Sequence, residues 1–259
     1  MSGLALIEAR VARAGQVLLD STSLAVRPGE LVVLAGPNAA GKTTAVRALL
    51  GLEPLASGSA QLGGSDVRRL APAERARRAA WLPQNRSFAW PLSVGRAVEL
   101  GRYAWGGAGA RPSVLDREAV DAALVACGLD ALRHRAVDAL SGGEQARVHL
   151  ARVLAARTPA ILADEPTGML DPAQADATLD LLAARARDGA AVLVVLHDLV
   201  LAARKADRVI LMQGGRVVAD GAPRDALAPE RLAEVFAIAS SWTGGRLELG
   251  PRLVPPGRP

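Results

Sequence analysis

The segment LVVLAGPNAAGKTT, residues 31–44, decides the fold. It opens with the short apolar run Leu31–Ala35, which is typical of a strand buried on both faces. Gly36 to Thr43 then fits the pattern G-x-x-x-x-G-K-[ST], and Thr44 to Leu50 continues with helical periodicity. Between a strand and a helix, backbone N–H groups can surround phosphate groups. The segment therefore predicts a phosphate-binding loop, in preference to a glycine-rich turn that fits the pattern by chance.

The residues of this loop are expected to bind ATP, and two of them have distinct chemistry. Lys42 is one of only two lysines, whereas every other basic residue is an arginine. A compact ammonium fits between the β- and γ-phosphate oxygens, where a flat guanidinium does not. The hydroxyl of Thr43 is expected to ligate Mg²⁺. The predicted phosphate-binding set is Gly36, Pro37, Asn38, Ala39, Ala40, Gly41, Lys42, Thr43 and Thr44.

Three further apolar runs predict parallel strands, and each precedes a polar residue. The runs are Ala79–Leu82, Ala160–Ala163 and Ala190–Leu196, followed by Gln84, by Asp164 and Glu165, and by His197. The carboxyl ends of parallel strands line one crevice in an open α/β sheet, so these side chains should converge. Asp164 is then expected to hold Mg²⁺, and Glu165 to polarise the attacking water. Taken alone, an acidic pair after a strand also fits a turn that caps a helix.

Two other patterns flank the predicted parallel sheet. Alternating segments at Ala5–Val11 and Val17–Val26, with the glycine-rich stretch Gly58–Gly64, predict a small antiparallel sheet. A helical subdomain is expected at about residues 87–157, inserted into a domain that covers residues 1–243. Its predicted helices are Val94–Leu100, Val114–Cys127, Ala131–Asp138 and Glu144–Ala156. Residues 244–259, rich in glycine, proline and arginine, are expected to form a loosely packed tail.

Composition narrows the classes of function. Half of the 259 residues are apolar and 22% are charged, which supports a sizeable core and argues against a disordered chain. Aromatic residues make up only 3%, too few for a groove that stacks bases, and acidic residues are interspersed with the arginines. We therefore expect no nucleic-acid partner. The single cysteine fits a cytoplasmic protein. No apolar run approaches the ~20 residues of a membrane span, so any role at a membrane would need a partner.

The segment LSGGEQ, residues 140–145, lies ahead of the strand that ends at Asp164. Ser141 and Glu144 fit a capping box, which would start the following helix without any ligand. The start of such a helix can also bind phosphate, so the two interpretations are compatible. Together with the phosphate loop, this segment resembles the signature motif of ATP-binding cassette (ABC) ATPases. The resemblance implies that Ser141, Gly142, Gly143 and Glu144 contact ATP.

The resemblance to ABC ATPases runs from about residue 4 to residue 240. It implies an α/β fold with a P-loop NTPase parallel sheet core, a flanking antiparallel β subdomain and an inserted helical subdomain. Gln84 would reach Mg²⁺ and sense the γ-phosphate, Asp171 in the segment 168–171 would belong to the D-loop beside ATP, and His197 would be the switch histidine. Arg13 stands where relatives usually place an aromatic residue that stacks on adenine. A guanidinium can also stack on a base, and a solvated arginine is the open alternative.

The resemblance also implies partners. In the family, each ATP lies between the phosphate loop of one subunit and the signature segment of another, so this chain is expected to form a homodimer. The dimer would move a pair of integral membrane permease subunits. The expected contact strip is Phe88–Val94, with Trp90 and Leu92 exposed, and internal packing of these side chains is the alternative.

The order of WLPQ at residues 81–84, AWPLSV at 89–94 and ELGR at 99–102 is similar to ATPase subunits of bacterial importers for ferric siderophores, haem and vitamin B12. This similarity implies a peripheral subunit on the cytoplasmic face of the inner membrane. A periplasmic or lipoprotein substrate-binding protein would be an indirect partner. An exporter ATPase would share every catalytic motif, and a soluble ABC ATPase of DNA repair or translation is a further alternative.

Overall fold

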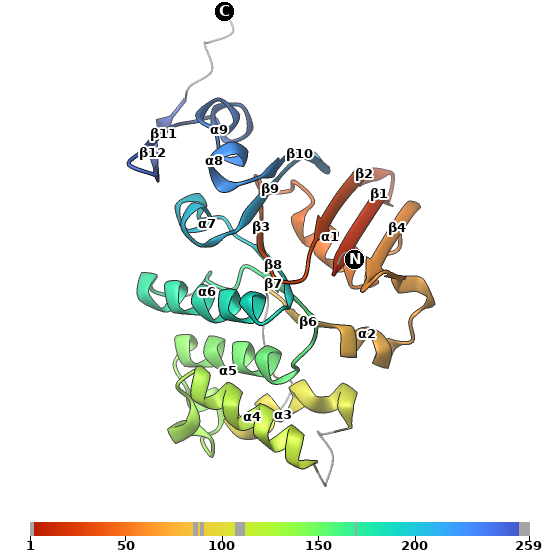
Figure 1. Cartoon of the computed structure of the whole chain (residues 1–259), viewed down its shortest axis with the longest axis vertical. Coiled ribbons are helices and arrows are strands. Elements are labelled where there is room, and N and C mark those ends of the chain that lie inside the picture. Colours follow the sequence, from red (N-terminus) through yellow and green to blue (C-terminus); the bar gives the residue numbers. More distant parts are fainter. Residues whose placement is uncertain (1–2, 85–87, 89–90, 107–111, 169, 254–259) are drawn as a thin grey trace, which may run out of the picture.

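The computed structural model describes residues 3–84, 88, 91–106, 112–168 and 170–253. Its centre is a six-stranded sheet in the order β10-β9-β3-β8-β7-β6 (Figure 1). Five strands are parallel, and β10 runs antiparallel to β9. The strands are β3 (Leu31–Ala35), β6 (Ala79–Leu82), β7 (Ala160–Asp164), β8 (Ala191–Val195), β9 (Arg208–Gln213) and β10 (Arg216–Gly221). This arrangement confirms the predicted α/β fold with a parallel core.

The apolar runs form strands because the central sheet is buried on both faces. Along β3, Leu31 and Val33 point into one hydrophobic core, whereas Val32 and Leu34 point into a second. The helices that bury the first face include α5 (Gly142–Ala155), α6 (Pro172–Arg187) and α7 (Leu199–Lys205). Helix α1 (Lys42–Leu49) and an antiparallel sheet bury the second face. Continuous apolar sequence is what such a doubly covered sheet requires.

The antiparallel sheet has the order β2-β1-β4-β5. Its strands are β1 (Leu4–Arg13), β2 (Gln16–Val26), β4 (Ser57–Leu62) and β5 (Ser65–Asp66). Ala14 and Gly15 connect β1 to β2 with φ angles of +48° and +81°. Two successive residues with positive φ make a tight hairpin turn, which places Arg13 opposite Gln16. Strand β2 lies at the edge of this sheet, on the side that approaches β10.

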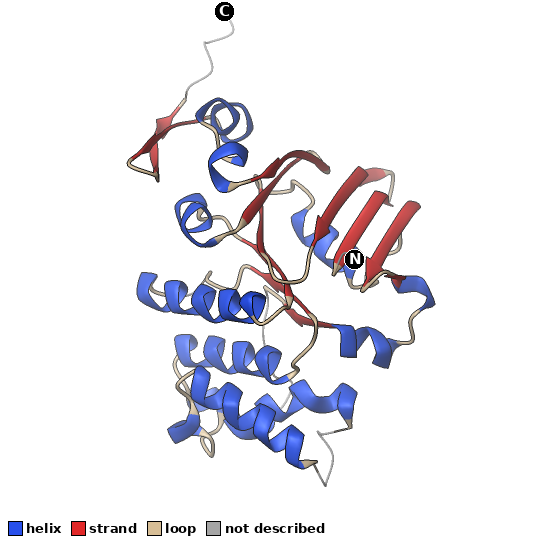
Figure 2. Ribbon diagram, in the orientation of Figure 1, coloured by secondary structure: helices blue, strands red, loops and turns tan. Residues whose placement is uncertain are grey.

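Between β6 and β7, the chain forms α3 (Val94–Glu99), α4 (Val114–Ala126) and α5, and Figure 2 shows these helices gathered together at one end of the molecule. Helix α2 (Pro72–Arg78) precedes β6. The predicted helix over Ala131–Asp138 is wrong, because the structure has only two short 3-10 turns there, Asp130–Leu132 and Val137–Ala139. The backbone between them pairs with a neighbouring segment: Val94 donates to the carbonyl of Arg135, and Val137 donates to the carbonyl of Leu92.

The C-terminal region differs from the loose tail expected at residues 244–259. After α8 (Pro223–Ala226) and α9 (Pro229–Phe236), the chain forms a hairpin of β11 (Ile238–Thr243) and β12 (Arg246–Arg252). Leu247 is buried, and the indole N–H of Trp242 donates to the carbonyl of Leu227 at 3.1 Å. In the described part of the chain, no helix has both the length and the apolar character needed to cross a membrane.

Candidate functional site

The phosphate loop joins β3 to α1 and needs glycine at two places. A Cβ atom on Gly36 would lie 2.2 Å from the carbonyl oxygen of Met212, and one on Gly41 would lie 2.7 Å from that of Leu18. Gly41 also has a φ of +97°, at the N-terminal cap of α1. Ala39 has a φ of +62°, which costs an alanine on the order of 1 kcal/mol. The backbone of the loop is therefore held in the conformation that the sequence pattern predicts.

Lys42 lies inside this loop and is only 6% exposed. Its ammonium donates to the carbonyl oxygens of Gly36 and Pro37, both at 2.8 Å. Burial lowers the pKa of Lys42, while the nearby carboxylates of Glu165 and Asp164 oppose this effect. The ammonium of Lys42 thus lies against two backbone carbonyls of the loop, on the cavity where phosphate oxygens could bind.

Asp164 ends β7 and is 1% exposed. Burial raises its pKa and so does the neighbouring Glu165 carboxylate, whereas a hydrogen bond with the side chain of Thr43 and the charges of Lys42 and His197 lower it. Its Oδ1 atom has no hydrogen-bond partner among the described residues. A buried carboxylate oxygen without a partner is costly, and a hydroxyl beside it completes a set of hard oxygen donors. These two residues therefore fit a Mg²⁺ ion.

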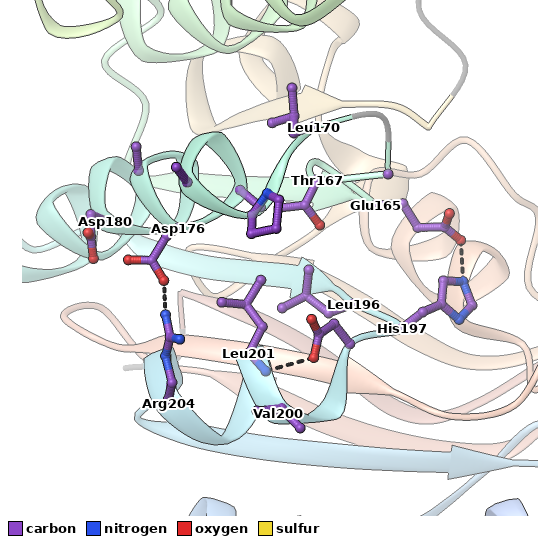
Figure 3. Close-up of a pocket in the computed structure, with 16 residues that line it drawn as sticks. Glu165, Thr167, Leu170, Asp176, Asp180, Leu196, His197, Val200, Leu201 and Arg204 are labelled. Carbon is purple, nitrogen blue, oxygen red and sulfur yellow. Dashed lines mark hydrogen bonds and ion pairs between the residues drawn. The ribbon is translucent and has the colours of Figure 1, made fainter. Parts of the chain in front are cut away.

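Glu165 follows β7 and contacts Gln84, which follows β6, and His197, which follows β8. The side chains from the ends of three neighbouring strands therefore meet at Glu165. Its Oε2 accepts from the amide of Gln84 at 2.7 Å, and its Oε1 lies 2.5 Å from Nε2 of His197. Figure 3 shows the Glu165 and His197 side chains pointing toward one another. Glu165 has a φ of +49°, a conformation that is unfavourable for a residue other than glycine. The predicted convergence of these polar residues is confirmed by these contacts.

A cavity of about 540 Å³ lies over this cluster and the phosphate loop. It is lined by Gln16, Val17, Leu18, Asn38, Ala39, Ala40, Gly41, Lys42, Thr43, Thr44, Gln84, Glu165, His197, Gly214 and Gly215. The sequence motifs do not mark the residues from strand β2, Gln16 to Leu18, or the two glycines as site residues. Gly215 belongs there because its N–H donates to the carbonyl of Ala40, and a Cβ on it would meet the carbonyl of Leu18 at 2.7 Å. In the sequence, only the glycine pair Gly214–Gly215 between two strand patterns could have indicated a close approach of another backbone at this place.

A second cavity, of about 790 Å³, lies between α6 and α7 and shares Glu165 and His197 with the first (Figure 3). Asp171, the predicted D-loop residue, caps α6 beside this cavity: its Oδ1 accepts from the backbone N–H of Gln174 at 2.8 Å. Met169, in the same predicted segment, lies outside the described residues. Asp171 lies between Leu170 and Pro172, which line the second cavity, and it is not among the residues that line the phosphate cavity.

The LSGGEQ segment forms the start of α5, where the capping box is present. The hydroxyl of Ser141 accepts from the N–H of Glu144, and the Glu144 carboxylate accepts from the N–H of Ser141 at 2.9 Å. Hydrogen bonds from the backbone and hydroxyl of Ser141 lower the pKa of Glu144. Ser141 and Gly142 are exposed, and the four residues 141–144 do not appear in the lining of the phosphate cavity. Within one chain, the signature segment and the phosphate loop therefore do not share a site.

Arg13 also lies outside the lining of the phosphate cavity. Its Nη2 donates to both carboxylate oxygens of Glu53, at 2.7 and 2.8 Å. The predicted contact between Arg13 and adenine is therefore not supported by the position of its guanidinium.

The predicted permease strip at Phe88–Val94 is only partly within the described residues, and Trp90 lies outside them. Phe88 stacks on the ring of His149 with a centroid distance of 4.4 Å. Leu92 is half-buried against the hydrophobic core that contains Leu31 and Val33, and Val94 is fully buried within that core. For Phe88, Leu92 and Val94, the internal-packing alternative is the one observed, whereas Pro91 is exposed.

Comparison with known proteins places this site in context. The ABC transporter family profile matches residues 19–168. The hemin import ATP-binding protein HmuV of Nocardia farcinica is 46% identical, over 85% of this chain and 75% of that protein. HmuV of Streptomyces coelicolor is 44% identical, over 88% of this chain and 80% of its own length.

Solved structures give the same fold. An inward-facing metal-chelate type ABC transporter aligns with a TM-score of 0.80 and 23% identity, covering 96% of both chains. An ATP-binding cassette of an ABC transporter in its ADP conformation aligns with a TM-score of 0.81 and 20% identity, over 91% of this chain and 98% of that one.

Proposed function

This chain belongs to the ABC transporter family as an ATP-hydrolysing subunit, and we propose that it powers the import of a metal chelate, with haem as the first choice. The observation that carries the chemistry is that Lys42, Thr43 and Glu165 line one cavity. The buried carboxylate of Asp164 lies next to them, hydrogen-bonded to the side chain of Thr43. The substrate class is inferred from relatives that are 46% and 44% identical and are named as hemin import proteins. Ferric siderophores and cobalamin are the other chelates to be compared.

The residues of the cavity divide the hydrolytic work. The loop and the Lys42 ammonium bind the β- and γ-phosphates and neutralise their charge. Thr43, Asp164 and Gln84 would hold Mg²⁺, which supplies positive charge to the phosphate oxygens when bound. Glu165 orients and polarises the attacking water. The Glu165 carboxylate is held in place by His197 on Oε1 and by Gln84 on Oε2.

We further propose that the chain works as a homodimer on the cytoplasmic face of the inner membrane, bound to a permease dimer that a substrate-binding protein loads from outside. The support for the dimer is the separation described above: the exposed Ser141 helix start lies outside the cavity that holds Lys42. A second copy would bring its own signature segment to that cavity. In such a complex Asp171, in the D-loop, would lie beside ATP at the dimer interface.

The decisive experiment reconstitutes the chain with its cognate permease in liposomes. Haem-loaded binding protein on the face opposite the ATPase should raise ATP hydrolysis, and haem should accumulate on the ATPase side. Ferric siderophore and cobalamin, each with its own binding protein, serve as substrate controls. Stimulation by a substrate presented on the ATPase side, with transport away from it, would instead identify an exporter subunit. Full ATPase activity that no permease or substrate alters would point to a soluble ABC ATPase.

A further inference from the structure

The position of Arg13 raises the question of what contacts the base of the nucleotide. Arg13 ends β1, directly before the tight turn at Ala14 and Gly15. Its partner Glu53 has a side chain that is only 5% exposed. Arg47 also contacts Glu53, with Nε 3.3 Å from Oε2. Two guanidinium groups therefore neutralise one buried carboxylate.

This pairing holds Arg13 in place. Moving the guanidinium to stack on a base would leave Glu53 buried with a single, longer contact, and an underpaired buried charge is strongly unfavourable. Glu53 also follows the C-terminal end of α1, whereas the phosphate loop is at its N-terminal end. A helix of this length spans about 12 Å. Arg13 is thus anchored toward the end of α1 that is remote from the phosphates.

On the side of strand β2, the phosphate cavity is lined by residues other than Arg13. Gln16 and Val17 lie at the start of the edge strand β2 and line the cavity together with Leu18. Val17 is 41% exposed, which makes it an accessible apolar side chain beside the phosphate loop. Gln16 is also exposed, and the Gly214–Gly215 turn lies on the same cavity. An apolar surface next to an exposed amide is the combination that suits the face and the edge of a purine.

We propose that the nucleotide base rests against Val17 with its polar edge toward Gln16, and that Arg13 is a structural partner of Glu53 without a base contact. The inference rests on the proposed use of ATP. A carboxamide carries both a donor and an acceptor and can present either, so Gln16 can pair with the edge of adenine or of guanine. Base recognition is therefore loose, and the dissociation constants for Mg·ATP and Mg·GTP should lie within about tenfold of each other.

The test compares ligands that share the phosphates but differ in the base. Calorimetry on the purified full chain measures the affinity for Mg·ATP, Mg·GTP and inorganic tripolyphosphate with Mg²⁺. Val17→Ser should weaken the binding of both nucleotides by about three- to tenfold and leave tripolyphosphate binding unchanged, because it removes apolar contact area. Val17→Tyr should tighten both nucleotides, again without affecting tripolyphosphate.

Arg13→Ala is the contrasting variant, and Arg10→Ala is its matched control on the same strand, since Arg10 makes only a 3.7 Å pair with Asp20. Arg13→Ala should leave all three affinities within about twofold of the wild type while lowering the melting temperature more than Arg10→Ala does. Weakened nucleotide binding with unchanged tripolyphosphate binding in Arg13→Ala would overturn the proposal. Unchanged nucleotide affinities in Val17→Ser and Val17→Tyr would also overturn it. Failure of the wild type to bind any of the three ligands would instead refute the proposed ATPase function.

Discussion

At the scale of single residues, Glu165 links the side chains that follow the two strands on either side of β7. Its carboxylate is held by Gln84 on one oxygen and by His197 on the other, at the end of the strand that carries Asp164. Glu165→Gln keeps the size of the side chain but removes its basicity. We expect this variant to bind Mg·ATP with wild-type affinity and to lose about 10²- to 10⁴-fold in turnover, the usual contribution of a positioned base.

Steady-state ATPase assays together with nucleotide titrations check this expectation. Glu118→Gln, on an exposed face of α4, is the control and should retain full turnover. A turnover near the wild-type value in Glu165→Gln would refute the assignment of Glu165 as the base.

Asp164 gives a pH-dependent prediction. Because burial raises its pKa in the folded chain above the unfolded value of 3.8, the folded state holds this proton more tightly. The contribution of Asp164 to stability is therefore most favourable at low pH and is lost as pH rises through the raised pKa. Asp164→Asn should stabilise the chain without Mg²⁺ at neutral pH by about 1 kcal/mol, and it should abolish Mg²⁺-dependent hydrolysis.

Urea unfolding of both proteins in a chelator, at pH 4 and pH 7, measures this effect. The stability advantage of Asp164→Asn should be larger at pH 7 than at pH 4. An advantage that is equal at the two pH values would contradict the raised pKa as its cause.

At the scale of elements, the C-terminal hairpin is predicted to be part of the folded core. Leu247 on β12 is 4% exposed, whereas Leu249 on the same strand is 44% exposed. Leu247→Ala should lower the free energy of unfolding by about 2 kcal/mol or more, and Leu249→Ala should change it by less than about 0.5 kcal/mol. Chemical denaturation measures both values. Similar small effects from the two variants would mean that the hairpin adds little to stability.

The elements also show what the sequence could predict. The bounds of β3 and β6 follow directly from their apolar runs, because a strand covered on both faces must be apolar at every position. The segment Ala131–Asp138 has helical composition, yet its backbone pairs with Leu92–Val94, a contact that no local pattern records.

Some residues of the site were predictable from the sequence, and others were not. The loop residues, Glu165 and His197 follow strands, and Asp164 is the last residue of one. Their convergence was therefore predictable from the geometry of a parallel sheet. Gly214 and Gly215 line the cavity because β10 packs against β2. Arg13 does not line it, because its guanidinium is hydrogen-bonded to the buried Glu53 carboxylate. Both facts depend on tertiary packing between segments that lie far apart in the sequence.

At the scale of the whole molecule, the proposed homodimer rests on the separation of the signature segment from the cavity of the phosphate loop within one chain. Gly143 at the start of α5 packs against Gln174 of α6, where an added Cβ would lie 2.6 Å from the side-chain oxygen. The start of α5 is thus fixed against its own chain while Ser141 and Gly142 remain exposed. In a two-fold dimer, each signature segment would complete the cavity of the other copy.

Mixing two defective chains tests this arrangement. Lys42→Ala removes the phosphate-loop ammonium, and Ser141→Arg blocks the signature segment, so each variant alone should be inactive as a homodimer. In a mixed dimer, the intact loop of the Ser141→Arg chain faces the intact signature of the Lys42→Ala chain, and one complete site is restored. An equal mixture should recover about a quarter of the wild-type ATPase rate, because half of the dimers are mixed and each has one of two sites intact. Normal turnover by Ser141→Arg alone would mean that the signature segment takes no part in the site. No recovery, while energy transfer between labelled chains shows that mixed dimers form, would contradict a site shared between two copies.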